Sequence, residues 1–219
     1  MKSTLFKAAL AASAIMMFGS ASADFGVGVK AGTLGLGLEG RWSPVPFLDV
    51  RVGANGYDYD TDGSEAGIDY DGTLELDSYY ATGNIKFPLS PMRLTGGVFA
   101  NNNEIALTSK DTGGQNIELG GVPFPADVVG TLTGRTYFED IAPYVGVGFD
   151  FEILGKVGLN FDLGLLWQGE PNVDLTADGT GAGLLPFQAA LELERQELED
   201  DLSDYKAYPV LSVAFIYNF

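Results

Sequence analysis

An acidic segment, Asp58–Asp69, has the residue types and the spacing of a calcium-binding loop. It reads DYDTDGSEAGID. Positions 1, 3, 5, 7 and 12 of an EF-hand loop supply oxygen ligands, and here they are Asp58, Asp60, Asp62, Ser64 and Asp69. Position 6, where the loop turns, is Gly63. Position 12 is an aspartate, a poorer bidentate ligand than glutamate, and the sequence predicts no flanking helices. We therefore favour a solvated acidic turn, with weak calcium binding in the millimolar range as the alternative. No other cofactor is predicted.

A second group of charged residues alternates with apolar residues along several segments. If the apolar residues of these segments face outward, ten charged side chains face inward: Lys30, Glu39, Arg41, Asp49, Arg51, Lys86, Arg93, Asp150, Asp162 and Asp174. The basic ones concentrate in the first half of the chain, and three aspartates lie in the second half. Two interpretations stay open. The charges form ion pairs that fill an interior, or they line a narrow channel with a transverse field that suits small polar or zwitterionic solutes.

Several classes of chemistry are excluded by composition. The chain has no histidine and no cysteine, so histidine-based catalysis, thiolate zinc sites and disulfides are absent. Its formal net charge of −18 argues against a nucleic-acid partner, which requires a basic surface. Paired carboxylates remain as a catalytic route, but most of the acidic pairs lie in predicted loops, where solvation explains them. We predict that the protein is not an enzyme.

The elements that position these residues are predicted to be strands. Val157, Leu159, Phe161, Leu163, Leu165 and Trp167 alternate with residues that are mostly polar or glycine, which is the period of a β-strand. The last strand ends at Phe219, with apolar residues at every second position before it. Many such strands, with aromatic residues near their ends, are typical of an all-β, antiparallel transmembrane β-barrel. A soluble exported β protein is the weaker alternative.

Turn signals set the predicted number of strands. Four proline-bearing breaks, at 43–46, 88–91, 140–143 and 169–172, are assigned to the periplasmic side. Longer breaks at 58–72, 108–128 and 179–206, and tight turns at 32–33 and 154–155, are assigned to the outer side. Ten strands result: 25–31, 34–42, 47–57, 73–87, 93–107, 128–138, 142–151, 156–168, 172–178 and 207–219. Eight strands is the alternative, reached by losing the short first and ninth strands.

The first 23 residues are predicted to be a signal peptide. Lys2 and Lys7 precede the apolar stretch 8–18, and Ala21-Ser22-Ala23 is a cleavage signal. The barrel domain is therefore expected to span residues 24–219.

One segment, Pro186 to Tyr205, is predicted to be an acidic helix in a long loop. Leu191, Leu198, Leu202 and Tyr205 form its apolar stripe. We expect this stripe to pack as a lid over the outer mouth of the barrel, and a mobile loop is the alternative.

The sequence also resembles a family of small, mostly uncharacterised proteobacterial outer-membrane β-barrels. The resembling segments are GVGVKAGTLGLGLEGRW, IAPYVGVGF, FDLGLLWQGEPNVDL and ERQELEDDLSDYKAYPVLSVAFIYNF. This resemblance implies a location in the outer membrane of a Gram-negative cell envelope and implies that Phe219 serves as the assembly signal. It carries over no catalytic residues.

The sequence therefore predicts a monomeric outer-membrane barrel that acts as a narrow, porin-like channel for passive diffusion. The expected partners are outer-membrane lipid and lipopolysaccharide, the barrel-assembly machinery and small solutes. The rival function is a non-conducting structural or surface-interaction barrel whose acidic loops bind divalent cations, including calcium that bridges to lipopolysaccharide phosphates.

Overall fold

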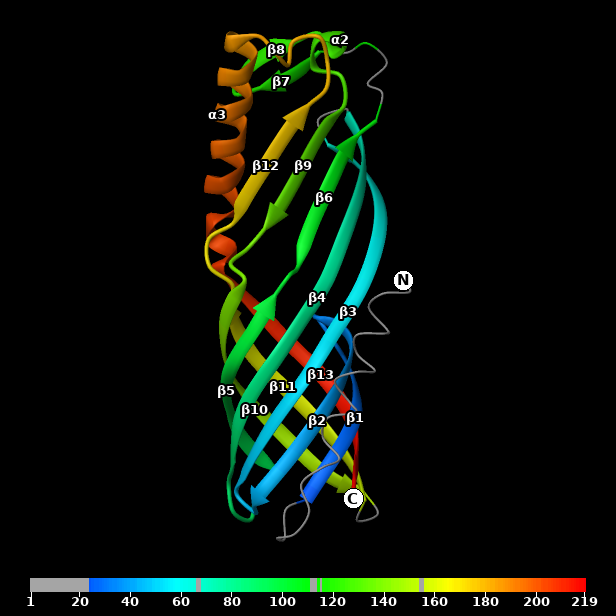
Figure 1. Cartoon of the computed structure of the whole chain (residues 1–219), viewed down its shortest axis with the longest axis vertical. Coiled ribbons are helices and arrows are strands. Elements are labelled where there is room, and N and C mark those ends of the chain that lie inside the picture. Colours follow the sequence, from blue (N-terminus) through cyan, green and yellow to red (C-terminus); the bar gives the residue numbers. More distant parts are fainter. Residues whose placement is uncertain (1–23, 66–67, 111–113, 115, 154–155) are drawn as a thin grey trace.

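The protein is described here by a computed structural model that covers residues 24–65, 68–110, 114, 116–153 and 156–219; the predicted signal peptide lies outside them. Eight antiparallel strands close into a barrel (Figure 1). They are β1 (Asp24–Gly32), β2 (Gly35–Val45), β3 (Leu48–Glu65), β4 (Ile68–Lys86), β5 (Met92–Asn101), β10 (Ile141–Ile153), β11 (Val157–Trp167) and β13 (Ala207–Asn218). β1 pairs with β13, and the pairing of β4 with β5 completes the ring.

The prediction of ten strands is wrong, and the alternative of eight holds for a different reason than expected. The first strand belongs to the barrel, whereas the predicted strands 128–138 and 172–178 do not. They appear as β9 (Leu132–Tyr137) and β12 (Asn172–Ala177), which pair with each other. Local alternation indicated strands correctly but could not tell which neighbours they pair with.

Both ends of the described chain, at Asp24 and Phe219, lie at one end of the barrel, here called the terminal end (Figure 1). The strand pairs β2–β3, β4–β5 and β10–β11 connect there, and the opposite end is called the far end. The breaks at 140–143 and 169–172 lie at the far end, which corrects their assignment to the terminal side. The turn at 154–155 lies outside the described residues, but the strands that it joins end at the terminal end, against prediction.

Beyond the barrel, the same sheet continues from the far half of β4 as a branch outside the ring. Its strand order is β4–β6–β9–β12, where β6 spans Glu104–Ser109. The predicted loop 58–72 falls within the extended β3 and β4 strands, which pair continuously from Leu48–Ile85 to Glu65–Ile68. We call everything beyond the barrel, including this hairpin, the far-end assembly.

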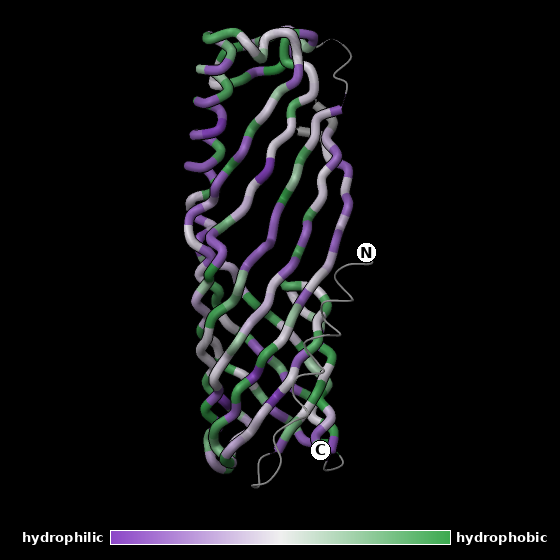
Figure 2. The backbone as a smooth tube through the Cα atoms, in the orientation of Figure 1, coloured by the Kyte–Doolittle hydropathy of each residue, from purple (hydrophilic) through white to green (hydrophobic). Residues whose placement is uncertain are grey.

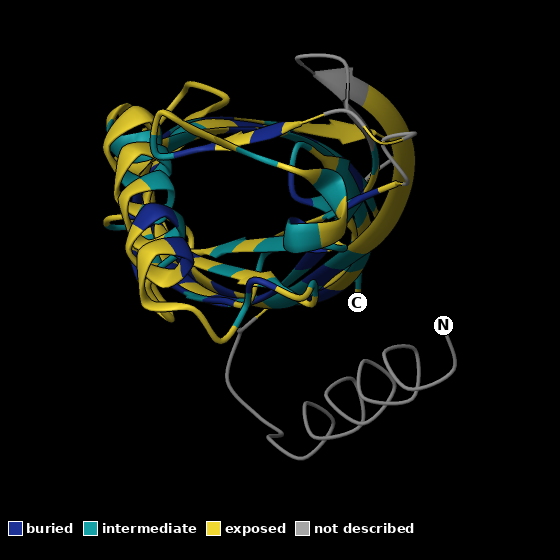
Figure 3. Ribbon diagram, turned by 90° about the horizontal axis from the view of Figure 1, so that it is seen from above, coloured by how far each residue is buried: buried dark blue, intermediate teal, exposed yellow. Residues whose placement is uncertain are grey.

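A small apolar core holds the far-end assembly together. A hairpin of β7 (Ile117–Leu119) and β8 (Val122–Phe124) turns at Gly120 and Gly121, whose φ values of 54° and 74° favour glycine. It packs with α2 (Ala126–Val129) and α3 (Leu185–Leu202) around a cluster, the far-end core: Ile117, Leu119, Val129, Leu132, Phe187 and Ala190. Figure 3 shows α3 at one side of the assembly when it is seen from above.

The position of α3 corrects both interpretations of the predicted helix. It lies beside β12 as a side wall, and neither covers the barrel axis nor projects freely (Figures 1 and 3). Leu191, Leu198 and Leu202 are half-buried as expected, but Tyr205 is 63% exposed and lies in the following 3-10 turn, Ser203–Lys206. The residues that anchor the helix most deeply, Phe187 and Ala190, were not in the predicted stripe.

The outer surface of the barrel is apolar. Figure 2 shows hydrophobic and hydrophilic residues alternating along the strands of its lower half. Outward positions carry exposed aliphatic side chains on every barrel strand, among them Val29, Leu38, Val52, Ile85, Leu94, Val98, Val145, Leu163, Leu165 and Leu211. No helix in the described part of the chain has the length and apolar character needed to cross a membrane.

Candidate functional site

The inward face of the barrel carries most of the charged residues proposed for it. Those that lie there are Lys30, Glu39, Arg41, Asp49, Arg51, Lys86, Arg93, Asp150 and Asp162. Asp174 does not, which is a correction: it lies on β12, outside the barrel, and its side chain is exposed.

Arg51 is the centre of an ion-pair network in the middle of the barrel. Its guanidinium lies 3.2 Å from the Asp49 carboxylate, 3.4 Å from Glu39 and 3.1 Å from Asp150. The pair with Asp150 crosses the lumen, because β3 and β10 are separated by two strands on the shorter way around the ring. Arg51 is 2% exposed, so this charge is stabilised by its carboxylate neighbours instead of by bulk water.

Arg93 forms the second half of this network. It donates hydrogen bonds to Asp150 at 2.8 Å and to Asp162 at 2.6 Å. Gly148 makes this possible, because it lies opposite both Arg93 and Asp162 and leaves space for the guanidinium to pass over its strand. A Cβ atom at Gly148 would lie 2.4 Å from Arg93 Cζ.

Uncharged residues complete the contacts of Arg93, and sequence analysis missed them. Asn84 and Thr95 accept hydrogen bonds from its guanidinium at 2.9 and 2.6 Å, and both are buried. They occupy inward positions by the same alternation that identified the charges, so the signal was present in the sequence.

An aromatic layer closes the lumen on the far side of the ion pairs. Tyr80 stacks on Phe99 with ring centroids 5.0 Å apart, and Phe99 contacts Tyr144 at 5.3 Å. The Tyr80 hydroxyl donates to Glu39 at 2.6 Å, which joins this layer to the network. Leu34, Ala142, Leu166 and Val210 pack against the rings.

The two layers leave almost no space along the barrel axis. The cavity between the ion pairs and the rings is about 10 Å³. Its lining includes Arg51, Arg93 and the three rings, together with Lys30 and Thr82. That volume is at the lower limit of what one water molecule needs. Arg51, Arg93 and Phe99, each at most 2% exposed, fill the lumen at this level of the barrel.

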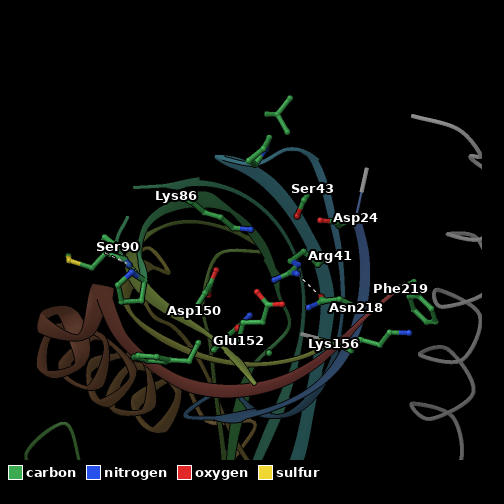
Figure 4. Close-up of a pocket in the computed structure, with 17 residues that line it drawn as sticks. Asp24, Arg41, Ser43, Lys86, Ser90, Asp150, Glu152, Lys156, Asn218 and Phe219 are labelled. Carbon is green, nitrogen blue, oxygen red and sulfur yellow. Dashed lines mark hydrogen bonds between the residues drawn. The ribbon is translucent and has the colours of Figure 1, made fainter. Parts of the chain in front are cut away.

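A much larger cavity opens at the terminal end (Figure 4). Its volume is about 520 Å³. Its charged lining residues have both signs: Arg41, Lys86 and Lys156 against Asp24, Asp150 and Glu152. Arg41 also donates a hydrogen bond to Asn218, and Lys86 forms an ion pair with Asp49 at 2.9 Å.

Several buried polar atoms around this cavity have no protein partner. They are Arg41 Nε, Ser43 Oγ and both amide atoms of Asn160, a side chain that is 1% exposed. Within the described ranges, these are the buried side-chain atoms of the cavity lining that lack a hydrogen-bond partner. Buried polar groups are normally hydrogen-bonded, so these atoms are free to hydrogen-bond water or a small polar guest.

The predicted walls of opposite sign are only partly present. Asp150 and Asp162 do face Arg51 and Arg93, but Glu39 and Asp49 lie on the same side as the basic residues and contact Arg51 directly. This mixing weakens the transverse field that the sequence predicted.

The acidic segment 58–69 lies, in its described residues, in the paired strands β3 and β4, which corrects the solvated turn that the sequence favoured. Asp58, Asp60 and Asp62 lie at alternate positions of β3, where successive side chains on one face are about 7 Å apart. Ser64 and Asp69 lie opposite each other in the β3–β4 register. Within the described ranges, no group of three or more acidic residues is arranged to hold a metal ion. Weak calcium binding at this hairpin stays an untested prediction.

The last residue, Phe219, continues the hydrogen bonding between β13 and β1. Its N–H donates to the Phe25 carbonyl at 2.9 Å, and its ring contacts Tyr217 at a centroid distance of 5.3 Å. The ring is exposed on the outer surface of the barrel.

Comparison with known proteins identifies the architecture. No protein-family model and no curated protein matches the chain. Among solved structures, Acinetobacter baumannii CarO2 is similar with a TM-score of 0.61 and 23% identity, covering 90% of this chain and 98% of that one. Acinetobacter baumannii CarO is similar with a TM-score of 0.57 and 24% identity, over 89% and 97% of the two chains. At these identities the likeness establishes a shared fold.

Proposed function

We propose that this protein is an outer-membrane barrel, with its terminal end in the periplasm and the far-end assembly outside the cell. The closed barrel with an apolar outer surface supports this proposal, because such a surface needs lipid around it. The expected signal peptide and the terminal strand that ends at Phe219 agree with it.

Cell fractionation tests this location. The mature protein should partition with outer-membrane lipid and should migrate differently on a gel before and after boiling. Recovery as soluble periplasmic protein without a gel shift would contradict the proposal. Deletion of Phe219 should impair assembly more than Asp174→Asn, which changes an exposed far-end residue of the same chain.

Within that membrane, we propose that the barrel is non-conducting in its resting state and serves to present the far-end assembly at the cell surface. One observation carries this proposal: Arg51, Arg93 and the Tyr80–Phe99–Tyr144 layer leave an internal space of only about 10 Å³. Solute passage would require breaking the ion pairs of Arg51 and Arg93, whose side chains are 2% and 1% exposed.

Single-channel recording in planar bilayers tests this closure. The refolded mature protein should give no unitary conductance steps. A variant that lacks residues 186–204 should be equally silent, since the seal lies inside the barrel and α3 lies at the side. Discrete steps from the unchanged protein would contradict a closed barrel, and steps only from the deletion would assign the seal to α3.

The terminal-end cavity favours a second candidate, a narrow passage for small polar or zwitterionic solutes. The cavity holds side chains of both signs and polar atoms without protein partners. In a passage of this kind, water screens the walls, so Asp162→Asn should shift ion selectivity toward anions and change stability little. In a closed barrel the same substitution should reduce stability and leave conductance absent.

A further inference from the structure

One strand edge of the far-end assembly has no partner strand in the described part of the chain. β2 pairs with β3 only as far as Leu36–Gly56, whereas β3 continues to Glu65 with β4 on its other side. From Tyr57 to Gly63, alternate backbone N–H and C=O groups of β3 therefore point away from the sheet. An unpaired edge of this length can hydrogen-bond another extended chain.

The two faces beside this edge differ in chemistry. On the inner face, Tyr57 and Tyr59 are 48% and 52% exposed and lie opposite Leu76 and Leu74 of β4. On the outer face, Asp58, Asp60 and Asp62 alternate with them. An added strand would therefore meet apolar side chains on one face and carboxylates on the other.

Lys110 shows how this outer face accommodates its like-charged pairs. Asp62 lies opposite Asp71 across the β3–β4 ladder, and the Lys110 ammonium lies 2.9 and 2.8 Å from their carboxylates. These hydrogen bonds raise the pKa of Lys110 and lower the pKa of Asp62.

A second like-charged pair has no such lysine. Asp58 lies opposite Glu75, both side chains are exposed, and no basic side chain of the described residues forms an ion pair with either. Like charges directly opposite each other in a ladder are destabilising. A basic side chain supplied from beyond the edge of β3 would relieve this repulsion as Lys110 does for its neighbours.

We propose that the Tyr57–Gly63 edge of β3 binds an extended segment of a partner protein in which basic and apolar residues alternate. The segment adds as a strand, with its basic residues beside Asp58 and Asp60 and its apolar residues over Tyr57 and Tyr59. A second copy of this chain fits poorly, because pairing two β3 edges would bring two rows of aspartates together.

A synthetic peptide with the order Lys-Val-Lys-Tyr-Lys-Val-Lys is the probe. Its binding to the full mature protein in detergent micelles can be measured by fluorescence anisotropy at low salt. A control peptide with the same composition but the order Lys-Lys-Lys-Lys-Val-Tyr-Val keeps the charge and loses the alternation. The alternating peptide should bind measurably tighter. Equal binding of both peptides would overturn the proposal.

Matched variants separate the edge from the overall negative charge. Asp58→Asn with Asp60→Asn should weaken binding of the alternating peptide about fivefold, the scale expected for two exposed ion pairs. Asp174→Asn with Glu197→Gln removes the same charge from exposed residues on β12 and α3 and should leave binding unchanged. Equal loss in both double variants would overturn the proposal.

Hydrogen exchange locates the peptide independently of charge. The amides between Tyr57 and Gly63 that point away from β4 should exchange more slowly when the alternating peptide is bound. Binding without this protection would contradict strand addition. Protection that rises with protein concentration in the absence of peptide would instead assign the edge to a second copy of this chain.

Discussion

Strands β3 and β4 run through both the barrel and the far-end assembly, but their polar and apolar faces are exchanged between the two regions. Within the barrel, β3 turns Asp49, Arg51 and Asn55 inward and Val50 and Val52 outward. Beyond Gly56 the inward positions become Tyr57 and Tyr59, and the outward ones become Asp58, Asp60 and Asp62. The pairing of β3 with β4 continues without a bulge, so the faces are unchanged and only the residue types are exchanged.

This reversal indicates where the surroundings of the strands change. An apolar outer face suits lipid and allows a polar interior, whereas an acidic outer face suits water and leaves the apolar residues to the interior. On β4 the outward residues follow the same order, from Ile85 through Ala81 and Tyr79 to Asp77 and Glu75. The boundary therefore falls near Ala54 on β3 and Tyr79 on β4.

We expect the largest difference in the free energy of unfolding between loss of a buried ion pair in the barrel and loss of an exposed one in the far-end assembly. Asp162→Asn removes a buried partner of Arg93 and should lower the free energy of unfolding by about 3–5 kcal/mol. Lys110→Met removes the exposed ion pairs with Asp62 and Asp71 and should cost about 0–1 kcal/mol. Urea unfolding in lipid vesicles measures both. Equal costs would contradict a dry, closed lumen.

The next comparison places arginine on the outer face of each region. Leu163 is 52% exposed in the middle of β11, and Leu163→Arg should cost about 2–4 kcal/mol if that surface contacts the bilayer core. Thr108→Arg, on the outer face of β6 opposite Asp71, should cost less than about 0.5 kcal/mol. The same unfolding assay applies, and a harmless Leu163→Arg would show that this surface does not face lipid.

A third change tests whether the two regions unfold separately. Val129 is completely buried in the far-end core, and Val129→Ala should destabilise that core by about 1.5 kcal/mol. Faster hydrogen exchange should be confined to β7, β8 and α3, with β11 and β13 unchanged. Faster exchange throughout the barrel would indicate one cooperative unit instead.

The smallest expected effect is a local titration on α3. Hydrogen bonds from Arg195 and then Gln196 lower the pKa of Glu192 to about 2. Because this folded-state pKa is depressed, the interaction is present above the unfolded pKa of about 4.3 and is lost as the pH falls toward 2. Arg195→Ala should return the Glu192 pKa toward about 4.3, measurable by NMR of its carboxyl carbon. An unchanged value would show that Arg195 is not its main partner.

The sequence predicted well those strands in which apolar outward residues alternate with inward residues along the whole strand. The predicted strands 156–168 and 207–219 match β11 and β13 to within one residue at each end. The extension of β3 beyond residue 57 was missed because alternating Asp and Tyr followed by Asp-Gly resembles a polar turn. Its strand structure depends on pairing with β4, which local composition does not encode.

For the candidate site, the sequence predicts which residues face inward but not which of them contact one another. Inward parity selects Arg51, Arg93, Asp150 and Asp162 from the sequence alone, because each alternates with apolar neighbours. Which of them meet across the lumen depends on strand number and stagger, which are properties of the closed ring. Asp174 was misplaced for that reason, since its strand never enters the ring.

Besides the β3–β4 hairpin, two segments of the far-end assembly, 102–139 and 169–205, leave the barrel and rejoin it, each between two residues that are already hydrogen-bonded. The Asn101 N–H donates to the Asp140 carbonyl at 2.8 Å, and the Gln168 N–H donates to the Lys206 carbonyl at 2.9 Å. The chain between each pair could therefore be replaced by a tight turn without moving either flanking strand. The eight-stranded ring is in this sense a complete scaffold with two insertion points, at which evolution or an engineer could exchange one surface module for another.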